Sequence, residues 1–309
     1  MQRNLGTLED EALGYTRFKD KDLEDTVMTQ HVIYHAQCQD GFASAFIAWR
    51  KFGDAATYSA ATYGQLPPDV SGEDVTVVDF CYPRAIMDEL NQVTSSLTVL
   101  DHHATALVAM QGFCPKCGTV HFDMAKSGAR LTFEHLFPDA DVPELILRVE
   151  DGDLNRFAMA GSKDYLSALD TVEHDFRAWE HLMTLGGSER QNFIDKGAAV
   201  NARMVRYCES VASEAVSFSL NGVVGLMVNA PRDMSSDLSN LLARRSGTFG
   251  GNWYLRHDGS IKVSLRSVAP FEVKSLAESF PGGGGHLHAA SFSLGGARLG
   301  DLLAGRLNA

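Results

Sequence analysis

Residues 75–103 read VTVVDFCYPRAIMDELNQVTSSLTVLDHH, and this stretch decides the fold. Its two apolar runs, 75–80 and 96–100, are rich in β-branched residues and are typical of buried strands. Residues 83–93 between them have the apolar spacing of an amphipathic helix. A strand, a helix and a strand in this order predict a parallel pair joined by a crossover helix.

The same pattern begins earlier in the chain. Residues 31–34 (HVIY) predict a short buried strand, and residues 42–52 predict a helix. We therefore predict an α/β fold whose N-terminal domain, residues 29–190, is a parallel sheet with crossover helices. Residues 1–28 are polar and lack a clear period, so they are expected to form an N-terminal extension.

The second half of the chain predicts a connector and a smaller domain. Helical patterns dominate residues 170–217, and residues 191–217 are expected to form one long connecting helix. Residues 218–309 then predict a smaller α/β domain. Its expected strands are 222–229, 252–256 and 261–265, and its expected helices lie around 236–243 and 271–280.

Composition narrows the class of protein. A length of 309 residues favours two domains. No apolar run reaches membrane-spanning length and no signal-type segment opens the sequence, so we expect a cytoplasmic protein without membrane contact. The net charge of −12 disfavours binding along long nucleic acid. A short anionic substrate stays compatible with this charge, because bound cations can attract it locally.

Polar side chains follow each predicted strand of the first domain. Residues 35–40 follow the first strand, Asp79 follows the second, and residues 101–103 (DHH) follow the third. Ligands bind at this edge of open α/β sheets, so the three groups are expected to converge. Imidazole and carboxylate groups suit Mn, Mg, Fe or Zn. Taken singly, Asp40 could equally cap the following helix, and Asp79 could be a structural carboxylate.

Seven short segments, taken in order, carry a resemblance to a known family. They are YHAQCQDGFASA, VVDF, LDHHAT, FDMAKSGARLTFEHLF, VEDGDLNRF, SLRS and GGGGHLHAASFSL. Together they span roughly residues 30–295, and their order resembles that of DHH superfamily phosphoesterases with a C-terminal DHH-associated domain. The first motif, with its HxxCxDG form, is most similar to the nanoRNase and cyclic-nucleotide phosphodiesterase-like branch.

This resemblance implies a metal-dependent phosphodiesterase that hydrolyses short oligoribonucleotides, or linear or cyclic dinucleotides, to mononucleotides. A small nucleotide would be its partner, and a homodimer is left open. Three alternatives remain: an exopolyphosphatase or a nucleotide phosphatase on the same scaffold, and a non-catalytic nucleotide-binding sensor.

The resemblance also implies a site with two divalent cations. Asp79 would bridge them, and His35 would bind the first. The second would be held by Asp40, His102 and Asp153, with Asp151 as the competitor of Asp153. His103 would contact the scissile phosphate. Manganese is the expected metal, with Mg, Co or Fe as alternatives.

One position departs from the family pattern. Many members have a carboxylate where this chain has Cys38. This thiol either ligates the first cation, which would favour softer metals than Mg, or is a small buried group without metal contact.

The second domain is expected to hold the substrate. Its glycine run exposes backbone N–H groups, His286 ends the run, and Arg266 can pair with a phosphate. The run comprises Gly282, Gly283, Gly284 and Gly285. The alternative is a glycine-rich turn beside a solvated Arg266.

A further pair of cysteines lies in the segment CPKCG. The five cysteines are odd in number and unevenly spaced, which favours reduced thiols or metal ligands over disulfides. Cys114 and Cys117 resemble half of a zinc knuckle, and His121 lies nearby in the sequence. A structural zinc needs four ligands and no second CxxC exists, so two free thiols are the expectation.

Overall fold

The computed structural model describes residues 29–36 and 38–309, and the predicted extension over residues 1–28 lies outside this range. The first sheet has five strands in the order β2-β1-β3-β4-β5, and every neighbouring pair is parallel. The strands are β1 (Gln30–His35), β2 (Thr57–Ala61), β3 (Asp74–Val78), β4 (Ser96–Asp101) and β5 (Val120–Phe122).

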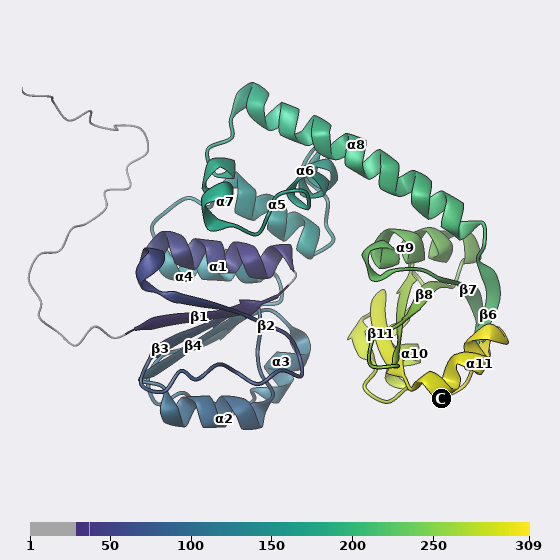
Figure 1. Ribbon diagram of the computed structural model, residues 1–309, viewed down its shortest axis with the longest axis horizontal. Coiled ribbons are helices and arrows are strands. Elements are labelled where there is room, and N and C mark those ends of the chain that lie inside the picture. Colours follow the sequence, from purple (N-terminus) through teal and green to yellow (C-terminus); the bar gives the residue numbers. More distant parts are fainter. Residues whose placement is uncertain (1–28, 37) are drawn as a thin grey trace, which may run out of the picture.

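Helices cover both faces of this sheet (Figure 1). On one face lie α2 (Arg84–Val93) and α3 (Ala104–Ala109), which pack on Ile33, Val77 and Val99. On the other face lie α1 (Gln39–Phe52) and α4 (Gly128–Leu136). Because both faces are covered, the central strands are rich in apolar residues, as in Val32 and Ile33 of β1 and Val77 and Val78 of β3.

A helical layer lies beyond α1 and leads to the second domain. It comprises α5 (Glu144–Asp153), α6 (Ser162–Leu169) and α7 (Phe176–Leu182), followed by the long helix α8 (Gly187–Ala212). Figure 1 shows α8 running from this layer across to the second sheet. Its C-terminal turn packs Cys208 and Ala212 against Leu238 and Leu242 of α9 (Ser235–Ser246).

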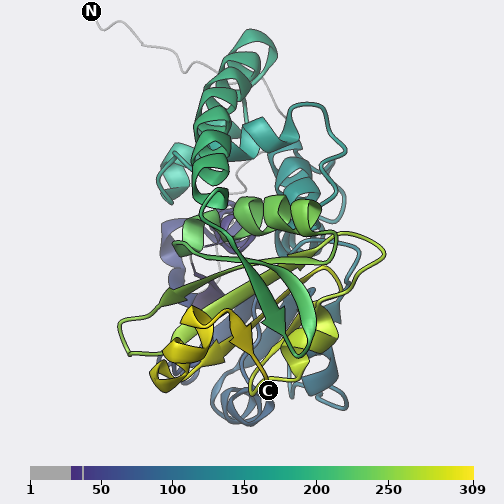
Figure 2. The same ribbon diagram turned by 90° about the vertical axis from the view of Figure 1, so that its right-hand side faces the viewer.

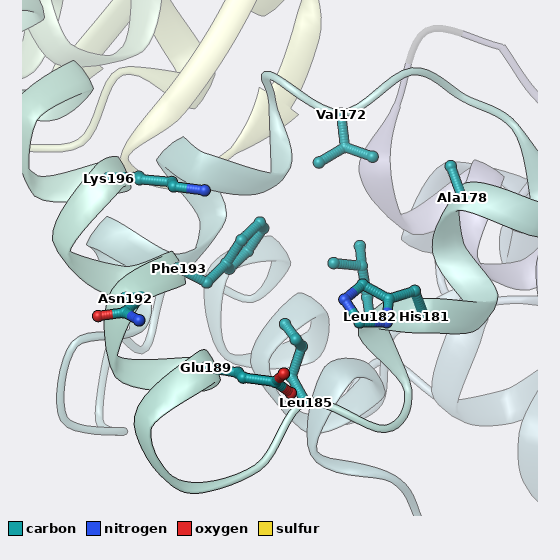
Figure 3. Close-up of a pocket in the computed structure, with 9 residues that line it drawn as sticks. All are labelled: Val172, Ala178, His181, Leu182, Leu185, Glu189, Asn192, Phe193 and Lys196. Atoms are coloured by element: carbon teal, nitrogen blue, oxygen red, sulfur yellow. The ribbon is translucent and has the colours of Figure 1, made fainter.

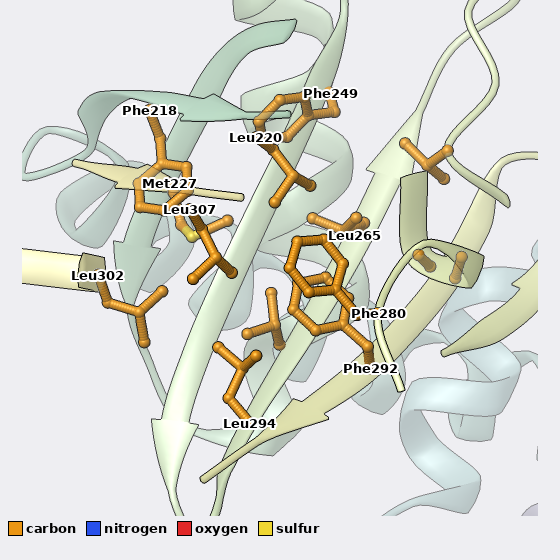
Figure 4. Packing of buried hydrophobic residues seen from close by; sticks show 14 of the residues in the cluster. Phe218, Leu220, Met227, Phe249, Leu265, Phe280, Phe292, Leu294, Leu302 and Leu307 are labelled. Atoms are coloured by element: carbon orange, nitrogen blue, oxygen red, sulfur yellow. The ribbon is translucent and has the colours of Figure 1, made fainter. Parts of the chain in front are cut away.

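The second sheet is mixed and has seven strands in the order β10-β11-β9-β8-β7-β6-β12. In Figure 2, α9 crosses one side of it. The other side carries α10 (Lys274–Glu278), α11 (Leu299–Leu303) and the apolar core around Phe249 and Phe292 (Figure 4). The strands are β6 (Val216–Leu220), β7 (Val223–Asn229), β8 (Phe249–Leu255), β9 (Ile261–Ser267), β10 (Gly284–His286), β11 (Ala289–Leu294) and β12 (Arg306–Leu307).

The predicted α/β class is confirmed, and two details of the prediction are wrong. The connecting helix spans Gly187–Ala212 rather than residues 191–217, because residues 213–215 form a turn and Phe218 and Leu220 alternate into the core from β6. The helix expected over residues 271–280 is confined to Lys274–Glu278. Within residues 29–36 and 38–309, no helix combines the length and apolar character that membrane crossing requires.

Candidate metal centre

The predicted ligands gather at the carboxyl edge of the first sheet. His35 is the last residue of β1, Asp79 directly follows β3, and His102 directly follows β4. Asp40 lies in the first turn of α1, and Asp153 is the last residue of α5. Three groups of side chains result, each with potential ligand atoms within 4.8 Å of one another: His35, Cys38 and Asp79; Asp40, His102 and Asp153; and Asp79, Asp101, His102 and His103.

Asp79 is shared between two of these groups through different oxygens. Its Oδ1 lies 3.1 Å from Nε2 of His102, and its Oδ2 lies 3.6 Å from Nδ1 of His35. The second distance is too long for a hydrogen bond, and both of its atoms are buried without a hydrogen-bond partner among the described residues. Two buried polar atoms that face each other across such a gap are suited to share a cation.

The other side of the cluster is centred on His102. Its Nε2 lies 3.7 Å from Oδ2 of Asp40 and 3.5 Å from Oδ2 of Asp153. These three side chains come from three different parts of the fold and offer nitrogen and oxygen ligands at one point. Manganese, iron and zinc all accept such a set.

The N-terminus of α4 fixes Asp40. The backbone N–H groups of Gly128 and Ala129 donate to its two oxygens at 2.6 and 2.9 Å. A Cβ on Gly128 would lie 2.4 Å from Cβ of Asp79, so only glycine allows this approach. The segment FDMAKSGARLTFEHLF therefore contributes to the site through its backbone, a role that was not predicted from the sequence.

Asp151 and Asp153 have different surroundings. The carboxylate of Asp151 accepts hydrogen bonds from the N–H groups of Ala158 and Met159 at 2.8 and 3.0 Å, so it holds the loop that follows α5. Asp153 faces His102 instead. Of the two competitors, the geometry places Asp153 in the cluster and leaves Asp151 outside.

The carboxylates of the cluster repel one another. Burial raises the pKa of Asp40 well above its ordinary value, and Asp79 and Asp153 add to the rise. Burial also raises the pKa of Asp153 to about 6. Burial opposes the protonated form of His102, yet Asp79 and the other carboxylates raise its pKa to about 9. Carboxylates that repel one another in such a site are stabilised by a divalent cation.

Cys38 precedes α1 and joins the group of His35 and Asp79. Burial raises the pKa of its thiol well above the ordinary value, and the charges of Asp79 and Asp40 raise it further. The thiol is therefore protonated when no cation is bound, and both interpretations of Cys38 remain compatible with its position.

His103 is oriented by a buried carboxylate. Its Nδ1 lies 2.7 Å from Oδ1 of Asp101, which also accepts from the N–H of His102 at 2.8 Å. Asp101 is fully buried. No separate role was predicted for Asp101, although its place in the DHH tripeptide was the available signal.

The predicted substrate-binding residues Arg266 and His286 lie on the two strands that flank β11 in the second sheet. Arg266 on β9 and His286 on β10 are both opposite Ala289 of β11 in the strand register. Nη2 of Arg266 donates to Oγ of Ser236 at 2.9 Å, and among the described residues no carboxylate forms an ion pair with this arginine. Burial lowers the pKa of His286, and the charges of His103 and His102 lower it further.

The glycine run is only partly a loop. Gly284 and Gly285 belong to β10, which is an edge strand, so part of its backbone faces away from β11. The N–H of Gly283 already donates to the oxygen of Phe280 at 2.9 Å, so this donor, predicted to face the substrate, is engaged within the domain. Gly282 precedes it with a φ of +67°.

Two other features lie apart from this cluster. Cys114 and Cys117 are exposed free thiols, and in the described part of the chain no third ligand approaches them. A pocket of about 410 Å³ between α7 and α8 is lined by none of the predicted site residues (Figure 3).

No protein-family model matches the chain. An uncharacterized protein of Acanthamoeba polyphaga mimivirus is 27% identical over 293 residues, which covers 86% of this chain and 67% of that protein.

Two solved structures share the arrangement of the elements. The DHH domain of a protein described as a member of a ribosomal-protein family has a TM-score of 0.57 at 14% identity, over 90% of this chain and 85% of that one. RecJ from Thermus thermophilus, solved with Mn²⁺, has a TM-score of 0.54 at 16% identity, over 91% of this chain and 53% of that one. The chain thus spans about half the length of RecJ. With its parallel first sheet, its helices and its mixed second sheet, the protein has the fold of the DHH-domain proteins.

Proposed function

We propose that the protein is a metal-dependent phosphodiesterase that hydrolyses short oligoribonucleotides, or linear or cyclic dinucleotides, to mononucleotides. One observation carries this proposal. Asp79 turns one oxygen toward His102 and the other toward His35, so a single carboxylate is shared by two sets of ligand atoms. Two cations that share a carboxylate form a typical centre for phosphoester hydrolysis.

The residues present fit two cations. His35, Asp79 and, where it ligates, Cys38 would hold the first, while Asp40, Asp79, His102 and Asp153 would hold the second. When bound, such a pair lowers the pKa of water at the site and stabilises the charge that builds up on the phosphoryl group. We propose manganese, because the ligand set combines imidazole with carboxylate and because the RecJ structure of similar fold was solved with Mn²⁺.

The remaining polar residues have roles that follow from their contacts. Asp101 holds Nδ1 of His103, which leaves Nε2 of this imidazole to meet the scissile phosphate. Arg266 is a half-buried cation without a carboxylate partner in the described chain, and it would pair with a substrate phosphate. The nanoRNase branch is proposed because its substrates are short and anionic, in keeping with the net charge of −12.

A turnover assay tests the proposal. Purified protein with Mn²⁺ is incubated with pGpG, pApA, 3',5'-cyclic AMP and inorganic polyphosphate, and products are separated by anion-exchange chromatography. Mononucleotides from pGpG or pApA are expected. Cleavage of polyphosphate alone would make the protein an exopolyphosphatase, and binding of nucleotides without turnover would make it a sensor.

A further inference from the structure

An exposed aromatic side chain, Tyr63, lies beside the metal centre. It comes two residues after Ala61, the last residue of β2, and β2 is the neighbour of β1 in the parallel sheet. Tyr63 therefore lies at the same carboxyl edge as His35 and Asp79. It was not predicted as a site residue, because β2 itself was not predicted.

The ring of Tyr63 is supported by two other rings. Its centroid lies 4.9 Å from that of Phe80 in a tilted arrangement and 5.6 Å from that of His35 edge to face. Phe80 is fully buried and directly follows Asp79, so the support is rigid. The position of the Tyr63 ring is thus tied to the centre through His35 and through the backbone of Asp79.

Most of this side chain is nevertheless open to solvent. Tyr63 is 58% exposed, and Leu66 on the same loop is 82% exposed. An exposed aromatic ring that contacts a residue of the polar centre suits an apolar part of a ligand. An aromatic ring in such a place offers a face for stacking.

The ring of Tyr63 contacts His35, a predicted metal ligand. Among the described residues, none forms a hydrogen bond with the hydroxyl of Tyr63. The ring is therefore both close to a predicted ligand of the centre and open to a bound molecule, as a nucleoside attached to a phosphate at the centre would require.

We propose that the ring of Tyr63 is a stacking platform for a nucleobase, and that it holds the nucleoside attached to the phosphate at the metal centre. This inference rests on the proposed function for the position of the phosphate. The ligand class is a nucleoside 5'-phosphate or the equivalent part of a dinucleotide. Stacking is tolerant of the base, because every base has a π-face.

Binding of two matched ligands tests the platform without relying on turnover. AMP and ribose 5-phosphate share the phosphate and the sugar and differ by the base. Their dissociation constants are measured by titration calorimetry with Mn²⁺-loaded full-length protein. The wild type should bind AMP roughly 10- to 100-fold more tightly than ribose 5-phosphate.

Three variants distinguish the contribution of the Tyr63 ring to AMP binding from that of its hydroxyl and from non-specific effects of substitution. Tyr63→Phe should keep the preference for AMP. Tyr63→Leu, which preserves an apolar contact with Phe80, should reduce the ratio to near one while leaving ribose 5-phosphate binding and manganese content unchanged. Tyr207→Ala, an exposed tyrosine of α8, serves as the matched control and should have no effect.

The outcomes distinguish this inference from the proposed function. If Tyr63→Leu retains the preference, or if Tyr63→Phe loses as much as Tyr63→Leu, the stacking role is rejected. Equal affinity of the wild type for both ligands, together with hydrolysis of pApA, rejects the platform alone. Preference for AMP without hydrolysis of any dinucleotide rejects the hydrolytic function and keeps the platform. Failure to bind either ligand, together with no hydrolysis of any dinucleotide, rejects both.

Discussion

Asp79 combines the central position in the cluster with an unusual backbone. Its φ is 51°, a region in which asparagine and aspartate are tolerated and most other side chains are strained. Strain of this kind persists where the surroundings fix the residue, and here α4 approaches so closely that a Cβ at Gly128 would lie 2.4 Å from Cβ of Asp79. The carboxylate is therefore held in place before any cation binds.

The substitution that tests the bridging role must be compatible with the positive φ at position 79. Asp79→Asn keeps the shape and the positive φ, whereas Asp79→Ala would add backbone strain to the loss of the ligand. We expect Asp79→Asn to lower kcat by at least a hundredfold, on the order of 3 kcal/mol or more in the transition state. Manganese stoichiometry, measured by elemental analysis, should fall from two per chain, while circular dichroism stays unchanged. Retention of both cations and of substantial turnover would contradict a bridging role.

Asp151 and Asp153 offer a matched pair of substitutions on one turn of α5. Asp153→Asn should weaken manganese binding without a loss of stability in the metal-free protein, because it removes one of several clustered charges that repel one another. Asp151→Asn should leave metal binding intact and lower the free energy of unfolding by about 1–3 kcal/mol, since its amide cannot accept from both N–H groups. Calorimetric metal titration and urea unfolding check both. Exchanged phenotypes would make Asp151 the ligand.

Substitution of Cys38 tests whether this position belongs to the coordination sphere of the first cation. Cys38→Asp adds a carboxylate next to Asp79 and Asp40, so the metal-free variant should unfold at a lower temperature than the wild type. With saturating Mg²⁺ or Mn²⁺ it should gain more thermal stability than the wild type, because oxygen ligands suit these cations. Cys38→Ser is the control for loss of the thiol. Equal metal-induced shifts in all three proteins would show that Cys38 lies outside the coordination sphere.

Elements differ in how far the sequence predicts them. β1, β3 and β4 are largely buried on both faces, so each contains an apolar run that can be recognised alone. β2 reads TYSAA and β5 has three residues, and both lie at the edges of the sheet, where only pairing with a neighbour makes them strands. Pairing between distant segments is not encoded in local periodicity.

The same limit applies to the candidate site. His35, Asp79 and His102 follow predictable strands, so their convergence could be expected from topology. The contact of Asp40 with the N-terminus of α4 joins residues 88 positions apart, and no local sequence pattern predicts it. Tyr63 could not be found for the related reason that its position depends on β2.

The crossing of α8 over α6 gives a prediction at the level of elements. Gly197 is buried, and a Cβ at this position would lie 1.6 Å from the backbone oxygen of Asp164. Gly197→Ala should therefore separate the two helices and destabilise the protein by about 1–3 kcal/mol, although alanine is the better helix former. Ala199→Ser, on the exposed side of α8, is the control, and urea unfolding is the measurement. If Gly197→Ala were more stable than the wild type, α8 and α6 would not be closely packed at this position.

At the scale of the whole molecule, α8 joins the domain that carries the ligands to the domain that carries Arg266 and His286. It packs on α6 around Gly197, its C-terminal turn packs on α9, and Lys163 of α6 pairs with Asp237 of α9 at 2.9 Å. The cluster of the first domain consists of imidazoles, carboxylates and a thiol. These groups can hold cations that polarise one phosphate, but they offer no guanidinium for a second one. A substrate with two phosphates would therefore need both domains.

Arg266→Ala tests whether the second domain binds the second phosphate of the substrate. A charge-assisted contact between arginine and phosphate contributes about 1.5–3 kcal/mol, so the variant should lose roughly tenfold to a hundredfold in kcat/KM for pApA. Bis(p-nitrophenyl) phosphate has a single phosphate that the metal centre can hold alone, and its hydrolysis should change far less. Manganese content should stay the same, and Arg244→Ala, an exposed arginine of α9, should change neither reaction. Equal losses on both substrates would mean that Arg266 acts on folding or on the chemical step. An arginine that binds only the second phosphate cannot affect a substrate that lacks this phosphate.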